Sequence, residues 1–323
     1  MTPATVLVTN RSFGTGDADP QELLEAHGLQ VVRADPDHSL EHLAEPPADA
    51  VAWIAGVGPI SGQHLDLAPN LRLVARYGTG VDAVDLGACA ARGVTVTNTP
   101  GANAGAVAEH TPMLILASLR RLLEGDAAVR SGAWKSARGR ELGSLHIGVV
   151  GFGRIGRRVA ELARCCGAAV SAHDPYLSSA SIRAAGVTPL PLSELVGVVD
   201  ILTLHRPGGN APLVDRAVLS QLRPGVVLVN TARRDLVDEA AVAAALRSGN
   251  LGGYASDVTR LEVDDELVTA PHTIFTPHVG AQTTEAIDRM GMTAAEEVLR
   301  VAVHNDRPKH PVAVAAGKGG VHL

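Results

Sequence analysis

The stretch LHIGVVGFGRIGRRVA, residues 145–160, decides the fold. A short apolar run at residues 147–150 leads directly into the glycine-rich turn GFGRIG at residues 151–156. Apolar residues then recur at helical spacing, at Ile155, Val159, Leu162 and Ala163. A strand, a glycine turn and a helix in this order are typical of the first crossover in a doubly wound parallel sheet.

The three glycines of this turn have separate chemical uses. Gly151 permits the tight turn, Gly153 lets the backbone approach a pyrophosphate, and Gly156 allows close packing of the helix. Arg154 and Ile155 open the helix, whose free N–H groups attract phosphate. The motif therefore predicts a dinucleotide site, and the alternative is a glycine turn that serves packing only.

Asp174 follows the next predicted strand, 18 residues after Gly156. A carboxylate at this place accepts hydrogen bonds from the ribose diol of adenosine and repels a 2′-phosphate. We therefore expect NAD, in its oxidised form or as NADH, and favour it over NADP.

Other short apolar runs extend the pattern in both directions. Predicted strands before the glycine turn cover residues 5–9, 30–33, 50–54, the region of Val74, and 94–97. Those after it cover residues 169–172, 201–204, 226–230 and 274–276. Helical segments lie between them, including a long one at residues 103–123. Nearly continuous apolar strands suit sheets that are covered on both faces. We expect an α/β protein with two doubly wound parallel sheets, and a loosely ordered tail from Arg307.

Composition excludes several classes of protein. The 323 residues suggest two domains, and 28 basic against 34 acidic residues leave a net charge of −6. That balance, with 2% aromatic residues, argues against a nucleic-acid partner. The apolar run at residues 113–119 is too short for a membrane span, and no Cys/His cluster has metal-ligand spacing. Three cysteines, two of them adjacent, and the absence of a signal-peptide pattern indicate a cytoplasmic protein with buried thiols.

Three polar residues follow predicted strands of the second series, where ligands of open α/β sheets bind. Arg233 can grip a carboxylate through two parallel hydrogen bonds. His278, in IFTPHVG, is suited to proton transfer near neutral pH, and Glu262 could orient it. From spacing alone, His205 is an equal candidate, and a capping or surface role for His278 stays open.

Several stretches together resemble the D-isomer-specific 2-hydroxyacid dehydrogenases, and within them the D-3-phosphoglycerate dehydrogenases. The matching stretches run nearly from end to end: ARYGTGVDAVDL (75–86), ARGVTVTNTPGANAGAVAEHT (91–111), LHIGVVGFGRIGRRVA (145–160), HDPY (173–176), VNTARRDLVDEAAV (229–242), ASDV (255–258) and TPHVGAQT (276–283). The resemblance implies a Rossmann NAD-binding domain, residues 100–284, inserted into a flavodoxin-like substrate-binding domain, residues 1–99 and 285–323.

The resemblance also implies the roles of individual residues. His278 is the acid/base at the 2-hydroxyl, Glu262 is its partner, and Arg233 holds the substrate carboxylate and polarises the carbonyl. Asp257 binds the nicotinamide carboxamide, and the backbone around Gly78 and Thr79 binds the substrate carboxylate. The other predicted cofactor contacts are His205, Arg206, Pro207, Thr231, Ala232 and Gly280. Residues 103–123 belong to a dimer-forming part, which predicts a homodimer, and Glu109 and His110 within it are interpreted as a structural pair.

Departures from the common family pattern concern the substrate. Tyr77 stands where a small residue is frequent, Arg234 where glycine is usual, and Thr259 where an aromatic residue is common. Together with Arg11 in the loop after the first strand, they suggest a substrate with a second anionic group, such as phosphate, phosphonate or carboxylate. Arg260 is a third candidate for binding that group, and the alternative is that each arginine is a solvated surface charge.

The expected activity is therefore that of an NAD-dependent oxidoreductase that interconverts a small 2-hydroxy acid and a 2-oxo acid. Two alternatives remain at this point. One is an NAD-sensing binding protein of dehydrogenase-like fold without catalysis. The other is a related dehydrogenase that acts on formate or phosphite.

Overall fold

The computed structural model describes residues 3–43, 49–262 and 265–313. The chain divides into two compact units. Unit 1 comprises Met1–Asn103 and Gln282–Leu323, and unit 2 comprises Ala104–Ala281. The middle of the chain thus forms one body, and its two ends form the other.

Unit 1 contains a parallel five-stranded sheet with the order β2-β1-β3-β4-β5. Its strands are β1 (Ala4–Val8), β2 (Leu29–Arg33), β3 (Ala50–Ala55), β4 (Leu73–Arg76) and β5 (Thr95–Thr97). Its helices are α1 (Pro20–Glu25), α2 (Gly62–Asp66), α3 (Leu86–Ala91) and α11 (Thr284–Val298), which ends in a π-helical turn, Leu299–Val303. This strand order is that of flavodoxin-like sheets.

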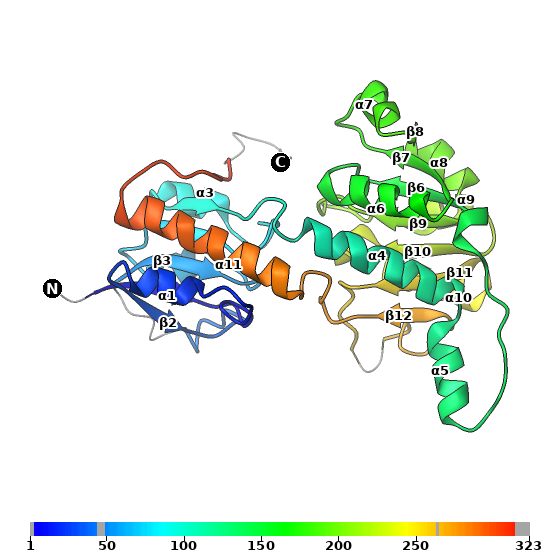
Figure 1. The fold of residues 1–323 in the computed structure, drawn as a ribbon, viewed down its shortest axis with the longest axis horizontal. Helices are drawn as coiled ribbons and strands as arrows, with labels where there is room; N and C mark the ends of the chain where they lie inside the picture. Colours follow the sequence, from blue (N-terminus) through cyan, green and yellow to red (C-terminus); the bar gives the residue numbers. More distant parts are fainter. Residues whose placement is uncertain (1–2, 44–48, 263–264, 314–323) are drawn as a thin grey trace. The chain divides into compact units, whose positions relative to one another are not determined.

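Helices cover both faces of this sheet. The helices α1 and α11 pack against each other, and α11 contacts β3 and β4 (Figure 1). The opposite face buries Trp53, Leu65 and Cys89 in one apolar cluster. The indole N–H of Trp53 donates to Thr9 Oγ1 at 2.9 Å, which satisfies a polar group in the core.

The segment beyond Arg307 is more ordered than the sequence suggests, as far as it is described. The amides of Lys309 and His310 donate to the buried carboxylate of Glu297 at 3.0–3.2 Å. Pro311 then forms a bridge with Thr97 beside β5. The expected loose tail is therefore wrong for residues 309–312, and residues 314–323 lie outside the described part.

Unit 2 contains a parallel seven-stranded sheet with the order β12-β11-β10-β9-β6-β7-β8. Its strands are β6 (His146–Val150), β7 (Ala169–His173), β8 (Thr188–Pro189), β9 (Ile201–Leu204), β10 (Val226–Asn230), β11 (Leu251–Ser256) and β12 (Thr273–Phe275). Its α-helices are α4 (Ala104–Leu119), α5 (Leu122–Arg130), α6 (Arg154–Cys165), α7 (Ser179–Ala184), α8 (Leu192–Val198), α9 (Arg216–Gln221) and α10 (Glu239–Arg247). Short 3₁₀ turns cover Leu142–Ser144 and Arg234–Leu236.

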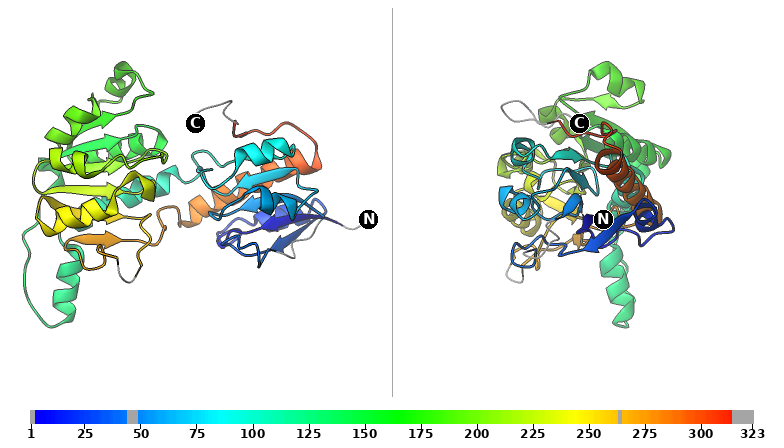
Figure 2. Two further views of the ribbon diagram at one scale, coloured as in Figure 1. Left: turned by 180° about the vertical axis from the view of Figure 1, so that it is seen from behind. Right: turned by 90° about the vertical axis from the view of Figure 1, so that its left-hand side faces the viewer.

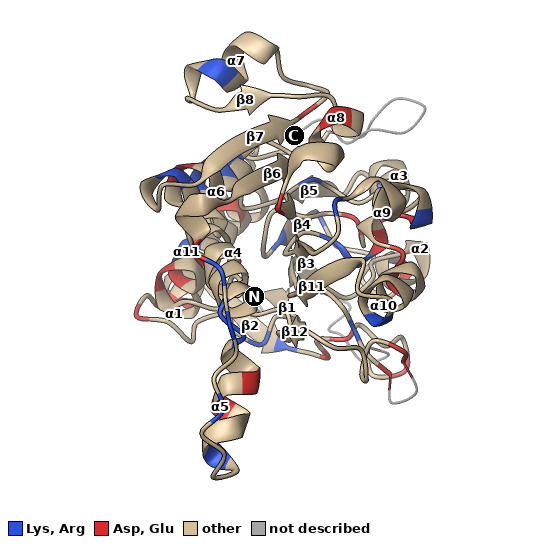
Figure 3. Ribbon diagram, turned by 90° about the vertical axis from the view of Figure 1, so that its right-hand side faces the viewer, with Lys and Arg blue, Asp and Glu red and all other residues tan. Residues whose placement is uncertain are grey.

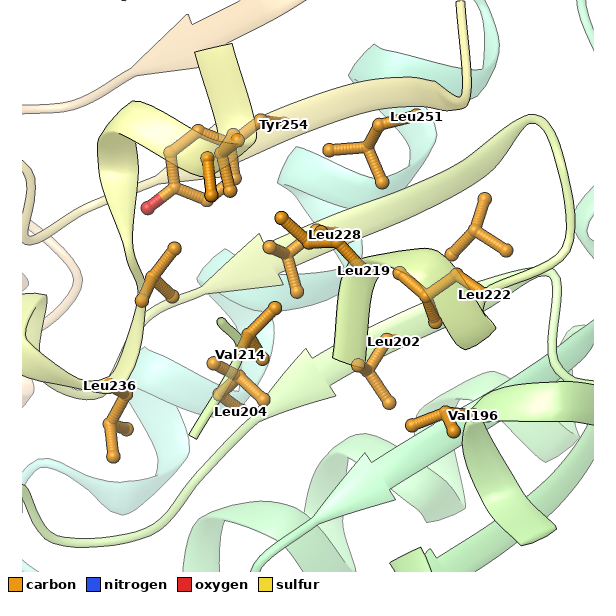
Figure 4. Close-up of a cluster of buried hydrophobic side chains, with 14 of the residues drawn as sticks. Val196, Leu202, Leu204, Val214, Leu219, Leu222, Leu228, Leu236, Leu251 and Tyr254 are labelled. Atoms are coloured by element: carbon orange, nitrogen blue, oxygen red, sulfur yellow. The ribbon is translucent and has the colours of Figure 1, made fainter. Parts of the chain in front are cut away.

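Alternate residues of the central strands enter two separate cores, as the period of two in a strand requires. On β10, Val226 and Leu228 join the cluster under α8, α9 and α10, whereas Val227 and Val229 join the one under α4 and α6. Figure 4 shows the first cluster. Figure 1 views the face with α4, and Figure 2 the face with the yellow α10.

Charged residues lie outside the strands of the unit 2 sheet. Its seven strands contain no Lys, Arg, Asp or Glu. Figure 3 shows charged positions on the helices and loops around them. The two parallel sheets confirm the predicted fold class.

Three details differ from the predictions. Strands β8 and β11 were not predicted; β8 has only two residues, and Gly252 and Gly253 obscure the apolar pattern of β11. The expected long helix is interrupted at Arg121, whose φ of 51° separates α4 from α5. Cys165 and Cys166 are exposed, and only Cys89 is a buried thiol. Within the described residues, no helix has the length and apolar character needed to span a membrane.

Candidate active site

The glycine turn after β6 leaves room for a phosphate where the motif predicts it. Gly151 has a φ of +90°, and a Cβ there would lie 2.4 Å from the carbonyl oxygen of His205. A Cβ on Gly156 would lie 2.1 Å from the carbonyl oxygen of Gly151, whereas Gly153 faces open space. No side chain caps the start of α6, so Arg154 and Ile155 begin a helix whose first N–H groups suit an anion. The turn fits a dinucleotide pyrophosphate.

Asp174 lies beside this turn, at the end of β7. Its Oδ2 accepts the amide of Phe152 at 2.8 Å, and its Oδ1 accepts the amide of Tyr176 at 2.9 Å. These bonds fix the carboxylate next to the glycines. The placement suits recognition of a ribose diol.

His205 follows β9 and packs against the glycine turn. Its Nε2 lies 2.9 Å from Thr203 Oγ1, and burial lowers the pKa of the imidazole to about 3. A histidine with that pKa is neutral at physiological pH and cannot supply a proton there. His205 is therefore no longer an equal candidate with His278 for proton transfer. The next residues, Arg206 and Pro207, form a more open loop in which Arg206 Nε donates to the Pro207 carbonyl at 3.3 Å.

Asn230 organises the loop that carries Arg233. It is fully buried at the end of β10, and its Oδ1 accepts the amide of Ala232 at 3.0 Å. Its Nδ2 donates to the carbonyl of Arg233 at 2.7 Å. One amide side chain therefore binds both an N–H and a carbonyl group of the loop backbone. Thr231 adds a link to α4, because its Oγ1 lies 3.0 Å from that of Thr111.

Asp257 organises the loop that carries His278. The carboxylate is 3% exposed, and the backbone amides of Val279 and Gly280 donate to it at 2.9 and 2.8 Å. Thr276 Oγ1 donates to its Oδ1 at 2.5 Å. Burial alone would raise the pKa of Asp257, but hydrogen bonds from these groups and from His110 outweigh it and lower the pKa. Asp257 is thus ionised at neutral pH. We call its bonds to Thr276, Val279 and Gly280 the Asp257 clamp.

His278 lies between the residues that the clamp holds. Its backbone has a φ of 57°, in the left-handed region that non-glycine residues rarely adopt. Its amide donates to the carbonyl of Thr276 at 3.0 Å, and the side chain is exposed. Strained backbone that its surroundings enforce is frequent at functional sites. The turn therefore presents this imidazole outward at the carboxyl edge of the sheet.

Glu262 lies farther along the same edge, in the loop after β11. It is exposed, and its carbonyl accepts the amide of Asp265 at 3.0 Å. The structure thus places the loops of Arg233, Glu262 and His278 after β10, β11 and β12, three consecutive strands of one sheet. Their catalytic roles stay predictions.

A second carboxylate joins the loops that carry Arg233 and Glu262. Arg234 Nε donates to Glu239 Oε2 at 2.8 Å, and Thr259 Oγ1 donates to Glu239 Oε1 at 2.7 Å. Two departures from the family pattern, Arg234 and Thr259, therefore share one partner. Arg234 is thus ion-paired, with 53% of its side chain exposed.

In unit 1, the predicted substrate residues occupy the end of β4. Tyr77 is buried, its hydroxyl donates to the carbonyl of Ile287 on α11 at 3.0 Å, and burial raises its pKa to about 12. The Gly78 amide donates to Thr99 Oγ1 at 3.0 Å, and Thr79 Oγ1 lies 3.3 Å from Asn103 Oδ1. The Tyr77 side chain thus holds α11 to the sheet.

Arg11 lies in the loop after β1 rather than at the end of β4. It pairs with Asp37 at 3.6 Å on an exposed surface.

Three residues were not assigned to the site from the sequence. Asn230 carries a signal that could have been used, because a polar residue ends an otherwise apolar strand. Thr276 is the first residue of the quoted TPHVGAQT motif, but nothing in the sequence marked it separately from His278. His110 was interpreted as the partner of Glu109, but its Nε2 lies 3.0 Å from Thr276 Oγ1.

Comparison with known proteins points to one family. The family model of the D-isomer specific 2-hydroxyacid dehydrogenase, NAD binding domain, matches residues 112–280. A D-3-phosphoglycerate dehydrogenase of Mycobacterium leprae is 40% identical over 269 residues, which are 81% of this chain and 51% of that protein. The chain spans about half the length of the curated relatives it matches.

Solved structures agree over nearly the whole chain. The TT0316 protein from Thermus thermophilus has a TM-score of 0.87 and 35% identity, covering 96% of this chain and 100% of that one. An NAD-dependent formate dehydrogenase from Staphylococcus aureus, in complex with NAD, has a TM-score of 0.83 and 27% identity, covering 97% and 99%.

Replacing Tyr77 by Phe separates the packing role from the predicted substrate role. The variant loses one hydrogen bond to α11, worth about 1 kcal/mol, so we expect the thermal unfolding midpoint to fall by about 2–4 °C. The KM for the 2-oxo acid should stay within about two-fold, because the hydroxyl is engaged in the core. A ten-fold rise in KM at unchanged thermal stability would assign Tyr77 to the substrate instead.

Proposed function

The chain belongs to the D-isomer specific 2-hydroxyacid dehydrogenase family, and we propose that it interconverts a 2-hydroxy acid and a 2-oxo acid by hydride transfer with NAD. The observation that carries this proposal is the turn of His278, which Asp257 holds on the same carboxyl edge of the sheet as the Arg233 loop. The glycine turn that fits NAD follows β6 on the same sheet. Ligands of such sheets bind along this edge.

Each residue has a defined task in this proposal. When bound, NAD supplies the chemistry of hydride transfer at its nicotinamide ring. Arg233 binds the substrate carboxylate and stabilises negative charge that grows on the 2-oxo oxygen. Protonated His278 gives a proton to that oxygen during reduction and takes it back during oxidation, with Glu262 as the group that orients it.

Asp257 has a structural task and a proposed one. In the described structure, its Oδ1 accepts Thr276 and Val279, and its Oδ2 accepts Gly280. A carboxylate oxygen has two lone pairs, so we propose that Oδ2 offers its second one to the nicotinamide carboxamide. We propose that Gly280, Thr231 and Ala232 also contact the cofactor, as the resemblance to the family implies.

Substrate size is the finer question. The relatives include D-3-phosphoglycerate dehydrogenases, and the sequence suggests a second anionic group on the substrate. The ion pairs of Arg234 with Glu239 and of Arg11 with Asp37 give two of the three candidate cations other partners. The proposal of a second anion site therefore relies most on Arg260, which is exposed.

A substrate panel tests the reaction and its specificity together. Oxidation of NADH at 340 nm should be seen with at least one 2-oxo acid, and kcat/KM should be higher with NADH than with NADPH because of Asp174. If oxo acids with a second anion react no faster than glyoxylate or pyruvate, the second-anion proposal is wrong. Oxidation of formate or phosphite alone would favour the alternative dehydrogenases, and tight NADH binding without turnover would favour a sensor.

His278→Asn tests the acid/base assignment through pH. In the native protein, kcat/KM for reduction should fall as the pH rises through the range where an imidazole loses its proton, and oxidation should show the opposite slope. The variant should lose both slopes and about 10²–10⁴-fold of the rate. His205 adds no slope near neutrality, because burial lowers its pKa to about 3. Activity within a few-fold of the native rate would refute the assignment.

We also propose that the enzyme is a cytoplasmic homodimer. Helix α5 buries none of its residues, and Figure 1 shows it extending away from the sheet of unit 2. Leu122 and Val129 on α5 are 57% and 58% exposed, and Met113 and Leu116 on α4 are also exposed. Exposed apolar side chains in this number mark an interaction surface, and the predicted dimer-forming segment contains most of them.

The mass in solution tests the dimer. Light scattering at micromolar concentration should give twice the mass of the chain. Leu122→Glu with Val129→Glu should shift the mass toward the monomer, because two charges would be buried in the interface. Thr188→Glu, at an exposed position on the far edge strand β8, serves as the control. A monomeric mass for the native chain would contradict the proposal.

A further inference from the structure

His110 connects helix α4 to the turn of His278. Its largely buried imidazole extends from α4, and its Nε2 lies 3.0 Å from Thr276 Oγ1 and 3.5 Å from Asp257 Oδ1. The partners are far apart in sequence, since positions 110 and 276 differ by 166. The contact therefore belongs to the tertiary structure of unit 2 rather than to the local fold of the helix.

The direction of these hydrogen bonds follows from counting protons. Thr276 Oγ1 donates its only hydrogen to Asp257 Oδ1 at 2.5 Å. It can then only accept from His110, so Nε2 of His110 must carry a hydrogen and donate it. The result is a donor chain that runs from His110 through Thr276 to the buried carboxylate.

The chain of hydrogen-bond donors ends on Asp257, whose carboxylate holds the residues on both sides of His278. Thr276 precedes His278 and reaches Asp257 through its hydroxyl, while Val279 and Gly280 follow it and reach Asp257 through their amides. Rotation of the Thr276 hydroxyl away from Asp257 would release the first side. Donation from His110 Nε2 to the hydroxyl oxygen opposes this rotation, because the oxygen must keep a lone pair directed at His110.

The surroundings of the imidazole leave it little freedom. A Cβ on Gly280 would lie 2.9 Å from Asp257 Oδ2 and 3.6 Å from His110 Cδ2, so the three groups are closely packed. Helix α4 has 16 residues and contacts β10, β11 and β12. The neighbouring Thr111 is also fixed, by Thr231 of the Arg233 loop. Helix α4 thus contacts the loop of Arg233 and the loop of His278.

We propose that His110 is a positioning residue for the reaction: it donates to Thr276, orients the Thr276 hydroxyl toward Asp257, and so holds the left-handed turn that presents His278. This inference rests on the proposed function for its effect on rate. Its structural part concerns the turn alone. Small displacements of a reacting group are costly, since a shift of about 1 Å can lower the rate about 10²-fold.

Three substitutions of His110 separate donation from mere packing. His110→Gln keeps an N–H donor near the place of Nε2, whereas His110→Asn carries its amide on a shorter side chain and His110→Leu has no donor. We expect kcat to fall about 10-fold or more in the Leu and Asn variants, with a smaller change in the KM for the 2-oxo acid, and to be largely restored in the Gln variant. Equal losses in the Gln and Asn variants would overturn the proposal.

Hydrogen exchange measures the turn without relying on activity. The amides of Val279 and Gly280 should exchange faster in the Leu and Asn variants than in the native protein, and at nearly the native rate in the Gln variant. Ser118→Ala is the matched control, because Ser118 is a buried polar residue of the same helix that donates to Leu114 within α4. The control should leave both exchange and kcat unchanged.

The two readouts distinguish a failure of this inference from a failure of the proposed function. If the native protein reduces no 2-oxo acid, the proposed function is wrong, and the exchange comparison still decides whether His110 holds the turn. Unchanged exchange at Val279 and Gly280 in both the Leu and the Asn variant would overturn the inference, whatever the activity of the native protein.

Discussion

The buried carboxylate of Asp257 is the interaction on which the candidate site depends. A charge with 3% exposure is costly unless hydrogen bonds replace the lost water. Here Thr276, Val279 and Gly280 all donate to it, and the lowered pKa keeps it ionised at neutral pH. The same bonds force the chain through the left-handed turn at His278. Without the charge, that turn would lose the partners that offset its strain.

The parallel sheet explains why such a carboxylate can organise the site. Strands β10, β11 and β12 are neighbours and run in one direction, so the loops that follow them emerge at one edge. Asn230 and Asp257 end adjacent strands as buried polar groups, and each captures the backbone of a loop. The apolar cores on both faces keep the strands in place, and this fixes the positions of the loops that carry Arg233 and His278. The catalytic candidates thus rely on buried polar residues that hold their loops.

Local patterns carried the sequence predictions furthest. The strand, glycine turn and helix at residues 145–160 were recognisable because each glycine answers a backbone requirement that is visible in the sequence. Strand β11 escaped notice because glycine at positions 252 and 253 replaces the side chains that mark a strand; at 252, a Cβ would lie 2.3 Å from the carbonyl oxygen of Gly225. The roles of His110 and Glu239 could not be predicted, since each depends on partners brought together only by folding. The bond from the Tyr77 hydroxyl to α11 could not be predicted from the sequence either, and the predicted role of Tyr77 in substrate binding stays a prediction.

A crystal structure of the protein with NADH and an unreactive 2-oxo acid analogue tests the central claim most directly. We expect Asp257 to keep its bonds to Thr276, Val279 and Gly280, and the imidazole of His278 to lie about 2.6–3.2 Å from the 2-oxo oxygen. An intact clamp with the imidazole directed away from the bound analogue would contradict the account, as would a His278 in contact with the analogue through a turn that no longer involves Asp257.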